Sequence, residues 1–218
     1  YIILDEKLTA CMISTKNVYN IITSRNSSKH IANIQNMWRG EIQNQQLDVS
    51  IFWSNNFPKY CDNMSKDIHY LFINNALMTR NRISKWDRST PAFCKYCLLR
   101  NRQEKENNMH AIIFCERISE FWRKINSLFK KFEIGLSIKN KIFGIQNPHK
   151  EIFKKILNSV LQIAQKTIWT TRQTFENLDT VQDVWKIFRN NVLSSLEIHR
   201  KYGEEKFQIE TFIKKKKN

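Results

Sequence analysis

The sequence predicts a mainly α-helical protein. Glycine and proline, which mark turns and β-bulges, occur only four and three times in 218 residues, and this scarcity favours helices over a many-stranded sheet. Apolar residues recur at steps of three and four along several segments, as expected for helices with one buried face. The hydrophobic content of 41% is sufficient for a sizeable core. We therefore expect a helical bundle with two helical halves.

Five segments carry this helical spacing. In order, they are 30–42, the segment around Ile68, 112–132, 152–175 and 181–199. The run in 112–132 predicts one continuous helix of about five turns, whereas 43–63 is predicted as a loop or a short helix that ends at Pro58. In 152–175 the residues predicted to face inward are Ile156, Val160, Leu161, Ala164 and Ile168. The aromatic residues predicted to pack in the core are Phe121, Trp122, Phe129, Trp169 and Trp185.

Three cysteines and one histidine form the clearest chemical signal. Their spacing is Cys94-x2-Cys97-x12-His110-x4-Cys115, which lets a tight turn and a short helix converge on one ion. Thiolate and imidazole groups bind zinc well, and four protein ligands complete its tetrahedral shell. We therefore predict one structural zinc ion in a Cys-Cys-His-Cys knuckle, residues 94–115, between the helical halves. The alternative is that the cysteines are buried thiols and His110 is a surface residue.

A DNA-reading zinc finger, which inserts a helix into the major groove, has similar ligand spacing. Its interior does not fit, because such a finger buries an aromatic residue and a leucine between its ligand pairs. This chain has Asn101 and Asn107 at those positions. The apolar residues instead lie around and beyond the last ligands: Ile112, Ile113, Phe114, Phe121 and Trp122. The site is therefore predicted to staple a turn to a larger helical body.

The chain carries a formal net charge of +16, large enough to attract a polyanion. Residues 93–218 hold 25 basic and 13 acidic side chains, against 11 and 7 in residues 1–92. RNA and DNA are the predicted partners, bound by phosphate contacts and by aromatic rings that stack on unpaired bases. The predicted contact residues are Arg80, Arg82, Lys85, Trp86, Arg88, Lys95, Tyr96, Arg100 and Arg102. A charge that serves only solubility is the alternative.

Other classes of protein are disfavoured. No run of about 18 apolar residues is present to span a membrane, and the first ten residues lack the features of a signal peptide. Five cysteines, an odd number, favour a reducing compartment. The sequence contains no Asp-Asp pair of the kind that polymerases use to bind two metal ions, no glycine-rich phosphate loop and no nucleophilic triad. We therefore predict no catalytic residue and no small-molecule substrate in this chain.

The residues around the knuckle resemble one family. The strings PAFCKYC and MHAIIFC, separated by a polar gap and followed by ERISEFWRKI, are similar to a segment near the C-terminus of reverse transcriptases from non-LTR (LINE-type) retrotransposons. DIHYLFINNALMTRNRISKW resembles the region that precedes this segment, and QKTIWTTRQTF resembles the helix that commonly follows it. The likeness covers about residues 15–175.

This resemblance implies a nucleic-acid-binding, C-terminal part of an RNA-directed DNA polymerase, which positions template RNA and target DNA for target-primed reverse transcription. The polymerase domain is then expected in the same parent chain, and a start at Tyr1 fits a piece of a longer protein. The implied localisation is nuclear and cytoplasmic, as a ribonucleoprotein. A stand-alone zinc-knuckle nucleic-acid-binding or chaperone protein and a helical scaffold for protein contacts are the alternatives.

The implied organisation has four parts. Residues 1–90 form a helical region that connects to the knuckle, and residues 91–133 contain the knuckle and the helix after it. Residues 134–203 form a C-terminal helical region. Residues 204–218 form a basic polar tail that contains four consecutive lysines, at 214–217.

Overall fold

The computed structural model describes residues 32–40, 42, 61–145, 151–172 and 181–202. The chain divides into two compact units, Tyr1–Trp53 and Ser54–Asn218. In the first unit, residues 32–40 are helical, and Ile34 and Trp38, one turn apart, are both buried. This agrees with the helix predicted for 30–42. The loop predicted for 43–63 lies almost wholly outside the described residues.

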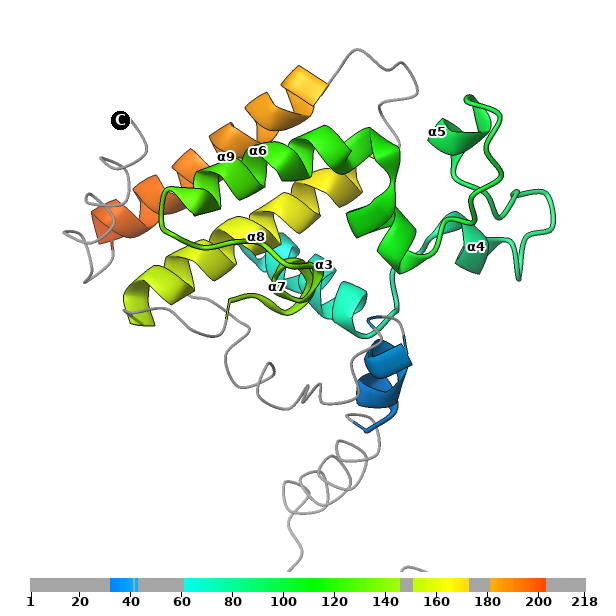
Figure 1. Cartoon of the computed structure of the whole chain (residues 1–218), viewed down its shortest axis with the longest axis horizontal. Helices are drawn as coiled ribbons and strands as arrows, with labels where there is room; N and C mark the ends of the chain where they lie inside the picture. The colour runs from blue at the N-terminus through cyan, green and yellow to red at the C-terminus, as the bar shows by residue number, and fades with distance from the viewer. Residues whose placement is uncertain (1–31, 41, 43–60, 146–150, 173–180, 203–218) are drawn as a thin grey trace, which may run out of the picture. The chain divides into compact units, whose positions relative to one another are not determined.

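The described part of the second unit is helical (Figure 1). Its elements are α3 (Asn63–Ile73), α4 (Arg80–Ile83), α5 (Lys95–Leu98), the π-helix η2 (His110–Phe114), the 3-10 helix η3 (Glu116–Ile118), α6 (Ser119–Lys130), α7 (Ile138–Phe143), α8 (Glu151–Thr171) and α9 (Val181–Tyr202). Among the described residues no strand forms, and the only β-type pairing is an isolated bridge between Phe93 and Lys105. The prediction of a mainly α-helical protein is confirmed.

Helix α8 is the centre of the second unit. It contacts α3, α9 and η2 (Figure 1). All five apolar residues predicted to face inward from it are buried. Polar residues such as Ser159 and Thr167 are buried too, so neighbours cover α8 on more than one face. No helix in the described part of the chain is both long enough and apolar enough to cross a membrane.

Helix α6 packs its aromatic face against α9. The ring of Phe121 meets that of Phe188 edge to face, with 5.3 Å between the ring centroids, and lies 6.0 Å from that of Trp185. Such pairs contribute about 0.5–1.5 kcal/mol each beyond the burial of apolar area. The core prediction is confirmed for Phe121, Trp122 and Phe129, which are buried, whereas Trp169 and Trp185 are only half-buried.

The single helix predicted for 112–132 is wrong. The chain forms η2, passes through Cys115 in an extended conformation with φ −58° and ψ 129°, forms η3, and only then enters α6. The apolar spacing continues across this break, so periodicity alone could not reveal it. The break occurs at a cysteine whose sulfur must turn toward three other side chains.

The segment after α7 is held against α8 by one amide. Asn158 Oδ1 accepts a hydrogen bond from the Ile145 N–H at 2.7 Å, and Asn158 Nδ2 donates to the Ile145 carbonyl at 3.3 Å. Gly144 precedes this contact with φ 81°, and a Cβ atom there would lie 2.7 Å from Asn158 Oδ1. Glycine is therefore required both by the backbone conformation and by the close approach.

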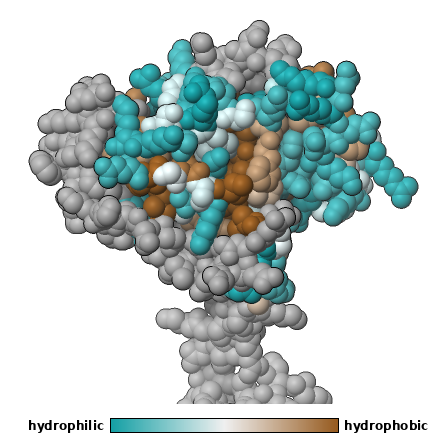
Figure 2. All heavy atoms as spheres, in the orientation of Figure 1, coloured by the Kyte–Doolittle hydropathy of each residue, from teal (hydrophilic) through white to brown (hydrophobic). Residues whose placement is uncertain are grey.

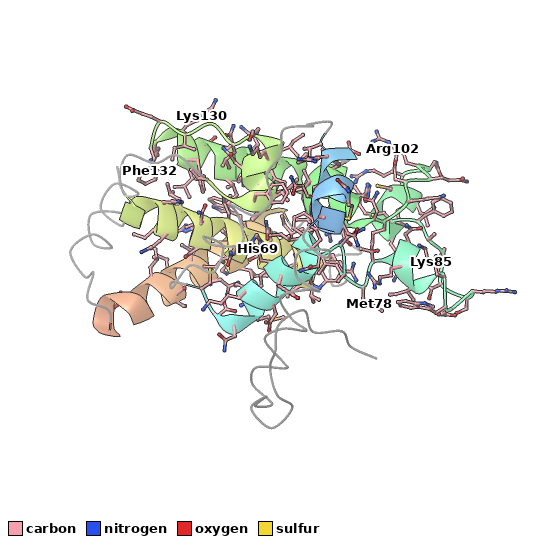
Figure 3. All side chains as sticks on the ribbon, turned by 90° about the horizontal axis from the view of Figure 1, so that it is seen from below. His69, Met78, Lys85, Arg102, Lys130 and Phe132 are labelled. Carbon is pink, nitrogen blue, oxygen red and sulfur yellow. The ribbon has the colours of Figure 1, made fainter. Side chains whose placement is uncertain are left out.

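A buried histidine joins α3 to α8 (Figure 3). His69 Nδ1 donates to Gln165 Oε1 at 2.7 Å, and Gln165 Nε2 in turn donates to the Lys141 carbonyl at 2.7 Å. His69 Nε2 is buried and has no hydrogen-bond partner among the described residues. Burial lowers the pKa of His69 to about 4, although the hydrogen bond to Gln165 opposes this shift. The imidazole is therefore neutral in the folded protein at neutral pH.

We expect His69 to make the stability of the fold depend on pH. Above pH 6.5 the imidazole is neutral in both the folded and the unfolded chain and has no effect. Between pH 6.5 and about 4 only the unfolded chain takes up the proton, so the free energy of unfolding should fall by up to about 3 kcal/mol. Urea denaturation at a series of pH values measures this loss.

The matched control is His69→Gln, whose amide can still reach Gln165 but does not titrate. Wild type and variant share every other titrating group, so the difference between their pH profiles isolates the imidazole. If both proteins lose the same stability between pH 6.5 and 4, the assignment to His69 is wrong.

Candidate metal centre

Cys94, Cys97, His110 and Cys115 meet at one point. Their potential ligand atoms all lie within 4.8 Å of one another. Cys94 Sγ is 3.9 Å from Cys115 Sγ, and Cys97 Sγ is 3.5 Å from His110 Nε2. A tetrahedron with metal–sulfur distances of about 2.3 Å and a metal–nitrogen distance of about 2.0 Å has edges of about 3.8 Å and 3.5 Å. The group could therefore hold one metal ion.

The first two ligands flank a tight turn. Cys94 is extended and immediately precedes α5, which contains Cys97. After α5 the chain reverses through Asn101, whose φ of 57° lies in the left-handed region that asparagine tolerates better than most residues. The Cys94 N–H then donates to the Glu104 carbonyl at 2.9 Å, which closes the loop. Asn101 therefore forms part of this turn and does not occupy the core of a zinc finger.

The other two ligands lie at the two ends of η2. Asn107 Oδ1 accepts the His110 N–H at 2.7 Å, which ties the chain before η2 to the first residue of that helix. The Cys115 N–H donates to the His110 carbonyl at 2.9 Å, a five-residue step that sets the separation of the two ligands. Trp122 Nε1 donates to the Ile112 carbonyl at 2.8 Å and ties η2 to α6.

The predicted apolar support of the knuckle is confirmed except at one position. Ile112, Ile113, Phe121 and Trp122 are buried. Phe114 is 54% exposed, so its predicted place in this support is wrong. The π-helical turn of η2 rotates residue 114 away from the body that residues 112 and 113 contact.

The three thiols influence one another strongly. A hydrogen bond from the Cys115 thiol lowers the pKa of Cys94 to about 4, with a smaller contribution from His110. Burial and the Cys94 charge raise the pKa of Cys97 to about 11, and donation to Cys94 raises the pKa of Cys115. These directions reflect like charges that cannot all form side by side. A divalent cation at the centre would stabilise all three thiolates together.

Arg117 lies next to the sulfurs. Burial lowers the pKa of its guanidinium, and the negative charges of Cys115 and Cys94 oppose that shift. Its Nη1 donates to the Thr171 carbonyl at 3.4 Å, at the end of α8. Three thiolates, a neutral imidazole and a divalent ion carry a net charge of −1, and Arg117 supplies a nearby positive charge to balance it.

A nearly buried ion pair makes a second connection between the knuckle and the end of α8. Arg172 Nη1 lies 2.9 Å from Glu106 Oε1, and only 9% and 10% of the two side chains are exposed. Glu106 Oε1 also accepts the Arg80 N–H at 3.0 Å, and Arg172 Nη2 donates to the Met78 carbonyl at 2.8 Å. The guanidinium stacks on Trp169, 3.4 Å from the ring centroid. Sequence reasoning missed this pair, because 66 residues separate its members and no local motif marks either one.

The nine predicted nucleic-acid contacts are divided between two cavities and the exposed surface of one lobe. Arg80, Lys95 and Tyr96 line a cavity beside the metal ligands, and Arg82, Lys85 and Trp86 line another. Trp86 is 65% exposed, unlike the core aromatic residues. The remaining three are exposed: Arg88, Arg100, which stacks on Tyr96, and Arg102, which pairs with Glu116 at 2.9 Å. All nine belong to the α4–α5 lobe, residues 79–107.

Comparisons of this chain with protein families, with curated proteins and with solved structures gave no match.

Loss of one ligand should abolish metal binding. In Cys97→Ser the weakly acidic hydroxyl replaces a thiolate, and the metal content per chain should fall from about one to near zero. Elemental analysis of protein purified without chelator measures this directly.

The matched control is Cys61→Ala. Cys61 is also a buried cysteine, but its thiol donates to the Ser159 carbonyl at 3.4 Å, and burial raises its pKa to about 12. This variant should lose about 1 kcal/mol of stability and keep its metal. Equal metal contents in Cys97→Ser and Cys61→Ala would contradict the assignment of the centre.

Proposed function

We propose that the metal is a structural zinc ion. Three thiolates and an imidazole form a donor set that suits zinc, and two of the ligand separations, 3.9 Å and 3.5 Å, are close to those of a zinc tetrahedron. Four protein ligands leave no position for a reactive water, so the ion holds the fold rather than performing chemistry. Binding such an ion contributes its free energy to the folding of the knuckle.

The knuckle and the lobe around it then bind nucleic acid. Four basic side chains line a cavity together with Cys94 and Cys115. The face drawn in Figure 2 has mostly hydrophilic side chains over the α4–α5 lobe, whereas hydrophobic side chains gather over the helical body. The exposed ring of Trp86, 5.8 Å from the Arg82 guanidinium carbon, adds a surface on which an unpaired base can stack. The observation that carries this proposal is that the four potential metal ligands meet beside the cationic α4–α5 lobe, which contributes two of them.

Together with the resemblance of its motifs, this supports a role as the nucleic-acid-binding, C-terminal part of a non-LTR retrotransposon reverse transcriptase. The chain would grip template RNA and target DNA, and the polymerase region of the parent protein would copy the RNA. Such a protein would assemble with RNA in the cytoplasm and act on chromosomal DNA in the nucleus.

The proposal predicts strongly salt-dependent binding to nucleic acid. If about six phosphates are contacted, the affinity for a DNA duplex should fall roughly a thousandfold between 50 and 200 mM salt. The double variant Arg100→Ala/Arg102→Ala should reduce affinity roughly tenfold at 100 mM salt without unfolding the chain, because both side chains are exposed. Fluorescence anisotropy with labelled duplex DNA and single-stranded RNA measures both effects.

The control is Lys130→Ala/Lys131→Ala on the end of α6 away from the lobe, where Figure 3 shows Lys130 opposite Lys85 and Arg102. It removes the same charge and should change affinity less than about twofold. An affinity for both probes that does not respond to salt would refute the proposed surface. Equal losses in the two double variants would show that net charge alone is responsible.

A further inference from the structure

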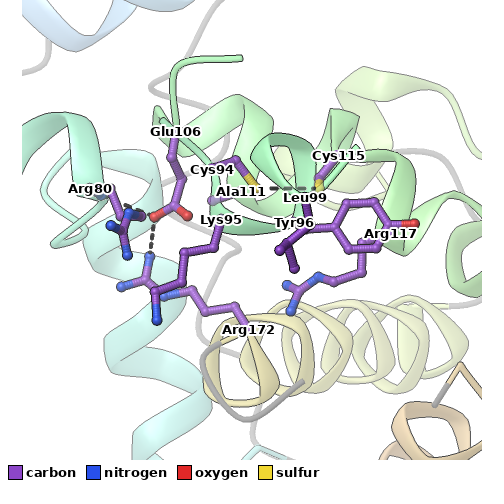
Figure 4. A pocket seen from close by; sticks show the side chains of 10 residues that line it. All are labelled: Arg80, Cys94, Lys95, Tyr96, Leu99, Glu106, Ala111, Cys115, Arg117 and Arg172. Carbon is purple, nitrogen blue, oxygen red and sulfur yellow. Dashed lines mark hydrogen bonds and ion pairs between the residues drawn. The ribbon is translucent and has the colours of Figure 1, made fainter. Parts of the chain in front are cut away.

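A cavity of about 330 Å³ lies between the knuckle and the end of α8 (Figure 4). Its volume is at the lower end of the range typical for small-ligand sites. One wall is formed by Cys94 and Cys115, and Tyr96 contributes an aromatic ring. The metal centre and this cavity therefore share a wall, and whatever fixes the knuckle also fixes the shape of the cavity.

Four cationic side chains from four separate parts of the chain line this cavity. Arg80 begins α4, Lys95 begins α5, Arg117 lies in η3, and Arg172 directly follows α8. Figure 4 shows the ends of Arg80, Lys95 and Arg172 on one side of the cavity and the guanidinium of Arg117 on the other. Such convergence is unfavourable unless negative charge is present, because like charges repel strongly where water is partly excluded.

The negative groups in the cavity wall do not balance these cations. Glu106 contributes one charge, and it already pairs with Arg172 and accepts the Arg80 N–H. A metal ion bound by three thiolates and a neutral imidazole contributes one more negative charge. Four cations against these two anions leave an excess of two positive charges at the cavity.

Partial burial of the Arg172 guanidinium makes this excess of positive charge more unfavourable. Burial lowers the pKa of Arg172, and the neighbouring charges of Arg117 and Arg80 lower it further, although Glu106 opposes the shift. A purely structural role accounts for Arg172 through Glu106, Trp169 and the Met78 carbonyl. Arg117 likewise donates to the Thr171 carbonyl and the Arg80 side chain to the Pro91 carbonyl, but these neutral carbonyls do not supply the negative charge that four converging cations need.

We propose that this cavity binds a phosphodiester group of a nucleic-acid strand. Arg117 and Lys95 contact the phosphate oxygens from opposite sides, and Tyr96 packs against the adjoining sugar or base. A guanidinium matches two phosphate oxygens at once, and an ammonium adds a point charge. The cavity is larger than one phosphate needs, and Arg100, stacked on Tyr96, extends the cationic surface outward along the lobe.

This inference rests on the proposed function and names two contact residues. Of these, Arg117 was not among the residues predicted from the sequence. It also gives the metal a second role, since the ion fixes α5, which carries Lys95, and η3, which carries Arg117, on either side of the phosphate.

The test uses the full zinc-loaded chain and a labelled single-stranded RNA 12-mer. Arg117→Gln should reduce affinity roughly tenfold and Lys95→Gln severalfold. Each should also lower the slope of log affinity against log salt by about 0.7, the value for one lost contact to a single strand. The matched control, Lys130→Gln, should change affinity less than about twofold and leave the slope unchanged. Zinc content and circular dichroism show whether each variant is folded, and Lys95→Gln, an exposed position, decides the test if Arg117→Gln does not fold.

A second arm distinguishes a strand phosphate from a free one. Inorganic phosphate at 10 mM is added to wild type and to Lys95→Gln, and the melting temperature is measured.

If wild type binds the RNA but Lys95→Gln and Lys130→Gln behave alike, the cavity assignment is overturned and the proposed function stands. If phosphate stabilises only wild type and no RNA binds, the cavity holds free phosphate and the strand assignment is overturned. If neither binds, both proposals are refuted.

Discussion

Three thiols and one imidazole meet within the dimensions of a single coordination sphere, and the surrounding chain is arranged to bring them there. The turn through Asn101 returns the chain beside Cys94, and the π-helical hydrogen bond from the Cys115 N–H to the His110 carbonyl holds these two ligands at the two ends of η2. A regular α-helix through this region would carry the Cys115 sulfur elsewhere. The helix is therefore interrupted at Cys115, which positions this ligand. The buried Trp122 of α6 still holds η2 in place by donating a hydrogen bond to the Ile112 carbonyl.

The knuckle is attached to the helical body at a second point, the Glu106–Arg172 pair. A nearly buried pair of this kind contributes little net stability, because both charges lose their hydration. Its geometry is nevertheless specific: Glu106 fixes the start of α4, and Arg172 fixes the end of α8. Two attachments of different chemistry hold the α4–α5 lobe in one orientation on the helices. That orientation is what places Lys95, Arg117 and Arg172 around a common cavity.

The parts of the fold that the sequence predicted are those determined by local periodicity and spacing. Helices α3, α8 and α9 follow from apolar residues at steps of three and four, because each helix is long enough for its pattern to be distinctive. The ligand set followed from the spacing of cysteine and histidine alone. The break at Cys115 could not be found this way, since the apolar pattern continues through it. The Arg117 contact and the Glu106–Arg172 pair depend on which helix lies beside the knuckle, and no short-range pattern records that information.

The central claim is that one zinc ion joins these four side chains. X-ray absorption at the zinc edge, on the full chain purified without chelator, tests it most directly. The account predicts about one zinc ion per chain, with three sulfur neighbours at about 2.3 Å and one nitrogen neighbour at about 2.0 Å. A protein without zinc, or a zinc ion surrounded mainly by oxygen, would contradict it.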